Sequence, residues 1–246
     1  MSRDTGGMIR TVDLLWGTDS PRGSRGPRPG LSVEKITSAA LAIADTEGIG
    51  VLSMQRIAKT LGYSTMSIYN YVPSKDQLIE LMLDAATPPP PPARDGASWR
   101  EELEDWVRAT WQLYQAHPWV LKVPTLSPPV GPNQLAWFEA ALHALSRSGL
   151  RGNEVLSLGL HVIGSLRGQA AMAADLTASA SERTAGEFEQ IVSRVVTEDR
   201  FPVLHTVIRR NGISEIGIAQ DVLVDLEFGL RLLLDGVEEH VKRHLG

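Results

Sequence analysis

The chain has 246 residues, with 24 Lys plus Arg against 29 Asp plus Glu, a formal net charge of −5 and no cysteine. This length suffices for one or two domains, and the lack of cysteine excludes disulfide scaffolds, thiol nucleophiles and cysteine-based metal sites. The acidic average excludes a surface coated throughout with Lys and Arg, but it leaves room for a nucleic-acid site confined to one patch.

The beginning of the chain does not have the pattern of a secretory signal. Charged residues such as Arg3, Asp4 and Arg10 interrupt any apolar core, and no small-residue cleavage pattern follows. Nowhere does the sequence hold about 18 consecutive apolar residues, the length of a membrane span. A cytoplasmic protein without a membrane partner is therefore expected.

Residues 1–30 are predicted as a flexible basic arm. Arg22, Arg25 and Arg28 stand among Gly, Ser and Pro, a composition that cannot bury enough apolar surface to fold. Two roles fit this arm equally: it could follow a minor groove or phosphates, or it could only keep the chain soluble. Apolar residues 12–16 suggest an extra helical turn docked on the protein.

Five consecutive prolines at 88–92 divide the rest of the chain, because such a run ends any helix and forms a stiff spacer. The predicted domains are a head at 31–86 and a larger body at 94–246. Residues 20–75 carry seven Lys or Arg against three Asp or Glu, whereas the remainder carries 17 against 26. The acidic average thus conceals a basic head on an acidic body.

The fold class predicted is all-α, because apolar residues recur at helical spacing and no segment alternates as a strand would. In the head, Ser32 is the expected N-cap and Gly48 the stop of the first helix. Ser74 is expected to open the last helix of the head in a capping box with Gln77. In the body, helices are expected around 103–114, 133–148, 153–178, 187–197 and 219–245.

Residues 53–72 predict a helix-turn-helix. Ser53 can cap a short helix, Gly62 allows the positive φ that ends it, and Ser64 can cap a second short helix. Two short helices joined by a glycine-containing turn form the motif that places its second helix in a major groove. The head is therefore predicted to be a three-helix DNA-binding domain.

The outward face of the second short helix carries short or aromatic hydrogen-bonding groups. Hydroxyls can bond base edges or phosphates, Met66 can touch a thymine methyl, and Lys75 adds a charge near the next helix. The alternative is that Tyr69 and Tyr71 are core aromatics and Ser64 is only a cap. The predicted DNA-binding residues are Ser53, Gln55, Arg56, Ser64, Thr65, Met66, Ser67, Tyr69, Asn70, Tyr71 and Lys75.

Residues 31–86 resemble the N-terminal domain of the TetR (tetracycline repressor-like) family of transcriptional regulators. The resemblance extends over more than fifty residues and is carried by the segments SMQRIA, LGYS, SIYNYV and SKDQL. Tyr71 stands where many members carry His or Phe. The resemblance implies a homodimer that binds double-stranded operator DNA, through contacts from Thr65, Met66, Ser67, Tyr69, Asn70, Tyr71 and Lys75. It also implies a variable C-terminal domain that binds a small effector.

The last predicted helix carries a seam suited to packing against another helix. Its apolar residues step by three and four along one face. Phe228 and Leu232 face a second direction, and a helix buried within a single chain is the alternative. The predicted dimerisation residues are Leu223, Leu226, Leu230, Leu233 and Val237.

An effector site is expected in the body, because such pockets are mainly apolar with a few polar anchors. The body holds several aromatic residues that could line such a pocket. As a set they suggest a large apolar or aromatic ligand, although each aromatic taken alone is compatible with an ordinary core position. Three glycines at 159, 164 and 168 indicate close helix approach or room for a ligand. The predicted effector-binding residues are Trp106, Thr110, Tyr114, His143, His161, Arg167, Gln169 and Met172.

No motif indicates an enzyme, a cofactor or a metal site. There is no nucleophile elbow, phosphate-binding glycine loop or pair of catalytic carboxylates. His240 and His244 are four residues apart, but they lie at a helix C-terminus, where the dipole favours His. We therefore expect a ligand-responsive repressor that binds a palindromic operator as a homodimer. The alternatives are a helical ligand-binding or scaffolding protein whose head does not bind DNA specifically, and a helical enzyme.

Overall fold

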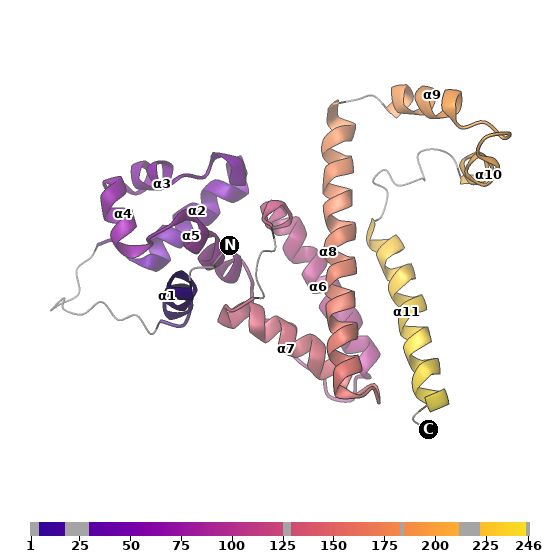
Figure 1. Cartoon of the computed structure of the whole chain (residues 1–246), viewed down its shortest axis with the longest axis horizontal. Coiled ribbons are helices and arrows are strands. Elements are labelled where there is room, and N and C mark those ends of the chain that lie inside the picture. Colours follow the sequence, from indigo (N-terminus) through magenta and orange to yellow (C-terminus); the bar gives the residue numbers. More distant parts are fainter. Residues whose placement is uncertain (1–4, 18–29, 125–128, 183–184, 212–221, 245–246) are drawn as a thin grey trace. The chain divides into compact units, whose positions relative to one another are not determined.

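The computed structural model describes residues 5–17, 30–124, 129–182, 185–211 and 222–244 (Figure 1). Within these ranges every regular element is a helix, as the sequence predicts. The chain divides into two compact units, residues 1–159 and 160–246. None of the described helices is long and apolar enough to cross a membrane.

The head consists of α2 (Val33–Glu47), the one-turn helix η1 (Ile49–Val51), α3 (Met54–Leu61), α4 (Thr65–Tyr71) and α5 (Lys75–Ala85). Serine hydroxyls cap four of these helices, as predicted, each accepting a hydrogen bond from the backbone N–H three residues later. Gly48 and Gly62 end α2 and α3 with φ of +86° and +75°. The helices enclose a core that includes the fully buried Ile36, Ile57 and Ile68.

The predicted capping box at Ser74 forms only in part. Ser74 accepts the hydrogen bond from the Gln77 N–H, but the Gln77 side chain turns away and donates from Nε2 to the Gly7 carbonyl at 3.2 Å. Gly7 belongs to α1 (Thr5–Leu15), which packs along α5. Trp16 extends this attachment, because its Nε1 donates to the Val130 carbonyl at 2.9 Å.

The prediction of a flexible arm over residues 1–30 is therefore wrong for residues 5–15, which form a helix. The segment 12–16 predicted to dock does so, with Leu14 and Leu15 packed against the head core. Apolar burial against α5 outweighs the polar composition that suggested an arm. The three arginines of the arm lie outside the described residues.

Two helices of the body pack against the head within the first unit. These are η2 (Pro118–Lys122), which follows α6 (Trp99–Ala116), and α7 (Pro132–Ser146). Trp119 is buried in the head core, and its Nε1 donates to Asp45 Oδ1 at 2.7 Å. His117 Nδ1 lies 2.7 Å from the same oxygen. The carboxylate at the end of α2 thus holds the segment after α6.

A second carboxylate, Asp84 near the end of α5, caps α7. Its Oδ1 accepts hydrogen bonds from the backbone N–H groups of Asn133 (2.9 Å) and Gln134 (3.0 Å). These are orphan donors of the first turn of α7, which its own N-cap, Gly131, cannot satisfy. A Cβ at Gly131 would lie 2.1 Å from Asp84 Oδ1, so only glycine fits beside this carboxylate. We call the contact of Asp84 with α7 the α5–α7 joint.

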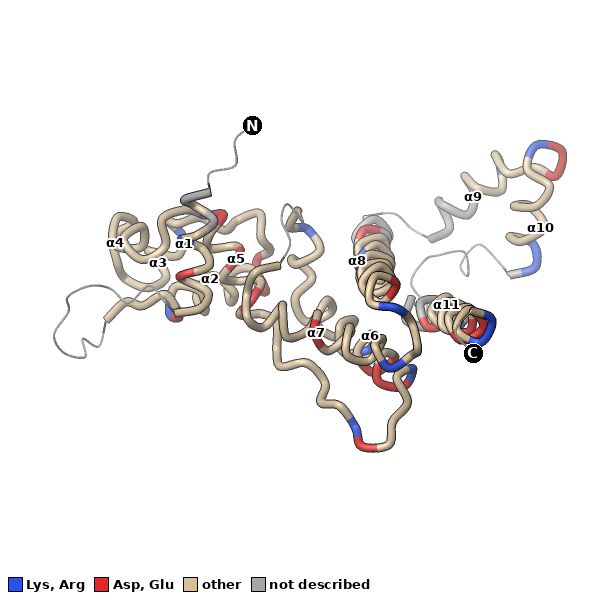
Figure 2. The backbone as a smooth tube through the Cα atoms, turned by 60° about the horizontal axis from the view of Figure 1, so that its bottom comes forward, with Lys and Arg blue, Asp and Glu red and all other residues tan. Residues whose placement is uncertain are grey.

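The second unit contains most of α8 (Gly152–Glu182), α9 (Ala185–Val195), α10 (Pro202–Asn211) and α11 (Val222–His244). Figures 1 and 2 show α8 and α11 side by side. Helix α8 continues to Glu182, past the end expected at residue 178. Helix α10 is absent from the sequence prediction, and it begins at Pro202, since proline is well tolerated at the first position of a helix.

Only one of the three α8 glycines fits the predicted close helix approach. A Cβ at Gly159 would lie 3.0 Å from Leu142 Cδ2 of α7, and 3.7 Å from Leu145 Cδ1. At Gly164 and Gly168, by contrast, an added Cβ would have no described atom within 4 Å. Close packing therefore explains Gly159 and leaves the other two glycines unexplained.

Replacing Gly131 by Ala should destabilise the protein, because the new Cβ would overlap Asp84 Oδ1. The expected loss in the free energy of unfolding is about 1–3 kcal/mol, the usual cost of overpacking. Gly152→Ala is the matched control, since a Cβ there has no neighbour within 4 Å among the described atoms. Urea denaturation of both variants checks this, and equal stabilities would refute the close contact.

Candidate nucleic-acid interface

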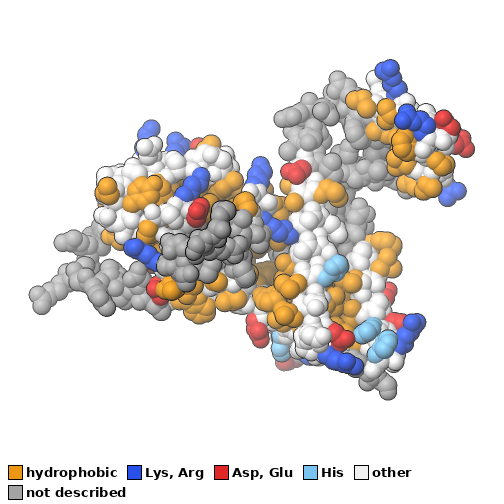
Figure 3. All heavy atoms as spheres, viewed as in Figure 1, with side chains coloured by type: hydrophobic (Ala, Val, Ile, Leu, Met, Phe, Trp, Pro, Cys, Tyr) orange, Lys and Arg blue, Asp and Glu red, His pale blue; other side chains and the backbone are white. Residues whose placement is uncertain are grey.

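The second helix of the helix-turn-helix, α4, has its inner face buried in the head core and its outer face exposed. Ile68 and Val72 are fully buried in the head core, whereas Met66 is 70% exposed. Tyr69 and Tyr71 are 43% and 37% exposed, so they are not core aromatics. Asn70 is also exposed. Figure 3 shows hydrophobic side chains at the surface over α3 and α4. This face has the shape and chemistry of a major-groove reading helix.

The hydroxyls at the helix starts are engaged within the protein. Ser64 Oγ accepts from the Ser67 N–H at 3.1 Å and lies 2.8 Å from Ser67 Oγ. Ser53 Oγ accepts from the Arg56 N–H at 3.1 Å. Thr65 and Ser67 are half-buried. These groups hold the first turns of α3 and α4, which leaves the tyrosines, Asn70 and Met66 as the freest groups on the surface.

The two cations of the predicted interface are positioned by neighbouring groups. Arg56 NH2 lies 2.6 Å from Glu47 Oε1 in an exposed ion pair. Lys75 Nζ donates to the Leu52 carbonyl at 2.8 Å, which places its charge beside the residue before the N-cap of α3. Gln55 is exposed beside them. Sequence reasoning missed Glu47, because nothing in a one-dimensional pattern pairs it with Arg56 nine residues later.

Of the eight predicted effector residues, four belong to the first unit and four to the second. A cavity of about 290 Å³ in the first unit is lined by Trp106 and His143, together with residues of the proline-rich linker. Thr110 is buried and donates to the Trp106 carbonyl, and Tyr114 packs against the head core. The other four predicted residues are in the second unit: His161, Arg167, Gln169 and Met172.

The predicted dimerisation seam divides between buried and half-buried positions. Leu230 and Val237 are buried within the chain together with Leu234, and Leu233 is half-buried. The side chains of Leu223 and Leu226 lie outside the described residues. Phe228 and Leu232, four residues apart, are 56% and 58% exposed. The exposed apolar face of α11 is therefore the one that carries Phe228 and Leu232, and not the predicted seam.

The titration of Asp84 distinguishes it from a surface carboxylate. Burial raises its pKa above the usual range, although the two backbone hydrogen bonds from α7 oppose this shift. A raised pKa means that the folded state binds the Asp84 proton more tightly than the unfolded state does. The contribution of this proton to the free energy of unfolding is therefore fully present at low pH and is lost as pH rises through the folded pKa.

Asp84→Asn should remove this pH dependence while retaining one acceptor oxygen for α7. As pH rises above the ordinary pKa of an aspartate, the wild type should lose unfolding free energy relative to the variant. Denaturant titrations at several pH values measure it, with Asp76→Asn on the same helix as the exposed control. A difference independent of pH would contradict the raised pKa.

The helix-turn-helix has a buried inner side and an exposed second helix, and a larger helical body follows it. These features define the class of helix-turn-helix transcriptional regulators. Two family models match: "Bacterial regulatory proteins, tetR family" over residues 36–82, and "Tetracyclin repressor-like, C-terminal domain" over residues 91–241. The chain belongs to the TetR family of transcriptional regulators.

Relatives and solved structures agree with this assignment. The chain is 36% identical to the HTH-type transcriptional repressor DrrR1 of Streptomyces coeruleorubidus, over 98% of this chain and 90% of that protein. The fold is similar to apo ActR of Streptomyces coelicolor, with a TM-score of 0.67, 24% identity, and coverage of 88% of this chain and 99% of ActR. It is also similar to BioQ bound to its double-stranded DNA operator, with a TM-score of 0.58, 19% identity, and coverage of 85% and 99%.

Proposed function

We propose that the protein is a ligand-responsive repressor that binds a palindromic operator as a homodimer in the cytoplasm, and that it is not an enzyme. The observation that carries the proposal is α4, whose polar and aromatic face is open above the buried Ile68 and Val72. The name of the repressor DrrR1 supports repression rather than activation.

The geometry of the head supports major-groove binding. Met66, the most exposed apolar side chain of α4, suits contact with a thymine methyl, and the tyrosine hydroxyls and Asn70 suit phosphate or base edges. Lys75, held at the Leu52 carbonyl before the start of α3, suits a phosphate. In a dimer the two copies of α4 would enter successive major grooves about 34 Å apart, which requires a palindromic site. BioQ, a structural neighbour, has been solved with its operator.

Release from DNA requires an effector that binds the two states of the protein unequally. A ligand that binds both equally shifts nothing, however tightly it binds. ActR has been solved with actinorhodin and with (S)-DNPA, which supports a ligand-binding role for the body of this chain as well. The α5–α7 joint would transmit the change, because it connects the last helix of the head to the body.

Tyr69→Ala should weaken operator binding without unfolding the protein. Loss of a hydrogen bond to a charged phosphate is expected to cost about 1.5–3 kcal/mol in binding free energy. Electrophoretic mobility shifts with DNA from the region upstream of the gene measure it, as a function of salt. Phe201→Ala is the matched control, because Phe201 is also an aromatic with 43% exposure but lies outside the head.

Unchanged affinity of the Tyr69 variant would exclude α4 as the reading helix. The absence of salt-sensitive, sequence-selective binding by the wild type would favour the alternative, a ligand-binding or scaffolding protein whose head does not bind DNA.

The open face of α11 is proposed as part of the dimer interface. Phe228→Glu together with Leu232→Glu should convert a dimer to a monomer, because two charges would be buried without partners. Light scattering measures the mass, and circular dichroism checks that the variant stays helical. A wild-type mass near the 26.8 kDa of one chain would refute the dimer. The control is Val203→Glu, on the highly exposed start of α10.

A further inference from the structure

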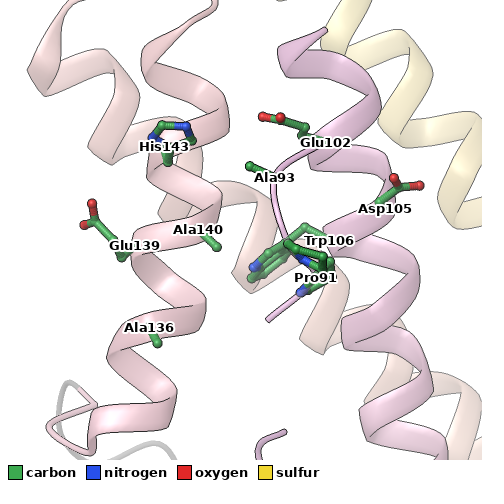
Figure 4. A pocket seen from close by; sticks show the side chains of 10 residues that line it. Pro91, Ala93, Glu102, Asp105, Trp106, Ala136, Glu139, Ala140 and His143 are labelled. Atoms are coloured by element: carbon green, nitrogen blue, oxygen red, sulfur yellow. The ribbon is translucent and has the colours of Figure 1, made fainter. Parts of the chain in front are cut away.

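A cavity of about 290 Å³ lies between α6, α7 and the linker residues Pro91–Ala93. Figure 4 shows Trp106 and Pro91 together on the α6 side, and Ala136 and Ala140 on α7 across from them. Sites for small molecules usually measure about 300–1,000 Å³, so this cavity suits a small molecule or one end of a larger one. Its walls are mainly apolar, with a few ionisable groups.

One lining carboxylate, Glu102, has a buried oxygen without a hydrogen-bond donor. The Glu102 side chain is only 9% exposed, and its Oε2 pairs with Arg147 NH1 at 2.6 Å. Its Oε1 is buried, and no group in the described part of the chain donates a hydrogen bond to it. Figure 4 shows the Glu102 carboxylate extending from α6 toward α7, on the side where His143 projects.

The other two carboxylates of the lining do not compete with Glu102. In Figure 4, the Asp105 and Glu139 carboxylates point away from the space between the two helices. Asp105 is further engaged by Arg94, at 2.6 Å between Oδ2 and NH2. Among the lining residues, Glu102 is thus the carboxylate that extends between the two helices and has one oxygen without a hydrogen-bond donor, while its other oxygen pairs with Arg147.

The chemistry of the cavity selects the ligand class. A buried carboxylate oxygen without a donor has lost its hydrogen bonds to water and gained none in return, so a ligand that brings a donor is favoured. A cationic donor is favoured over a neutral one, because it adds a Coulombic attraction to the carboxylate that a neutral donor lacks. The Trp106 Nε1 already donates to the Trp137 carbonyl at 2.8 Å, so its indole offers only apolar surface.

We propose that this cavity binds a small organic ammonium ion. On binding, a turn of the Glu102 carboxylate brings the buried Oε1 to the cavity, where it accepts a hydrogen bond from the ammonium group, while Trp106 and Pro91 cover the apolar body of the ligand. The proposal rests on the proposed function and names its effector class. Helix α8 does not line the cavity, so the site differs from the predicted set at residues 161–172.

Calorimetric titration of the full-length protein with phenethylammonium and naphthylethylammonium tests the proposal, with phenethyl alcohol and naphthylethanol as neutral counterparts. Each ammonium ion should bind about tenfold to hundredfold more tightly than its alcohol, because both can donate a hydrogen bond to the carboxylate but only the ammonium ion adds a charge pair. Glu102→Gln should abolish this difference. The matched control Glu139→Gln should retain it, because that carboxylate lines the cavity but points away.

The loss of Arg147 pairing could unfold the Glu102 variant, which circular dichroism would reveal. In that case Ala140→Leu, which fills the cavity and leaves the carboxylate in place, must abolish ammonium binding. Equal affinity for ammonium and alcohol, no binding of either ammonium ion to the wild type, or binding unaffected by Ala140→Leu overturns the proposal.

A mobility shift without any ligand separates the two hypotheses. If the protein binds DNA selectively but neither ammonium ion, the ligand site fails and the proposed repressor function stands. If the ammonium ions bind in a Glu102-dependent manner but no DNA is bound selectively, the repressor function fails and the site stands.

Discussion

The carboxylate of Asp84 fixes how the head of this protein meets α7 within the first unit. One buried oxygen satisfies two backbone donors at the start of α7, while the Asp84 carbonyl accepts a hydrogen bond from Asn133 Nδ2 at 3.0 Å. Because hydrogen bonds are directional, these three contacts set the direction of α7 relative to α5. The contact requires a glycine at 131, and it fixes the chain immediately before the proline-rich linker.

The DNA-reading surface depends on the same frame. Helix α4 has seven residues, too few to be stable alone, and it is held by its serine cap and by the burial of Ile68. The core that buries Ile68 includes Leu78 and Met82 of α5, the helix that ends at the joint. A movement of α5 relative to α7 would therefore carry the reading helix with it.

Local signals explain why the head was predictable from the sequence. Ser53, Gly62 and Ser64 define helix ends through contacts with residues at most four positions away, so their roles can be read without the fold. The long-range contacts could not be read in this way. Asp84 and Asn133 are 49 residues apart, and Glu102 and Arg147 are 45 apart. Gln77 fitted a capping box locally, yet a distant carbonyl on α1 took its amide.

A chain of hydrogen bonds connects the cavity with the joint inside the first unit. The Trp106 indole donates to the Trp137 carbonyl, and the Trp137 indole donates to the Pro88 carbonyl at the start of the linker. One residue earlier, the Thr87 N–H donates to the Asp84 carbonyl at 3.1 Å. The linker residues that line the cavity are thus continuous with the segment that holds Asp84. A ligand that moves Trp106 or the linker must strain or repack these contacts. Since the indole of Trp137 is buried, it cannot exchange the Pro88 carbonyl for water without repacking, and the next contacts along the chain are those of the α5–α7 joint.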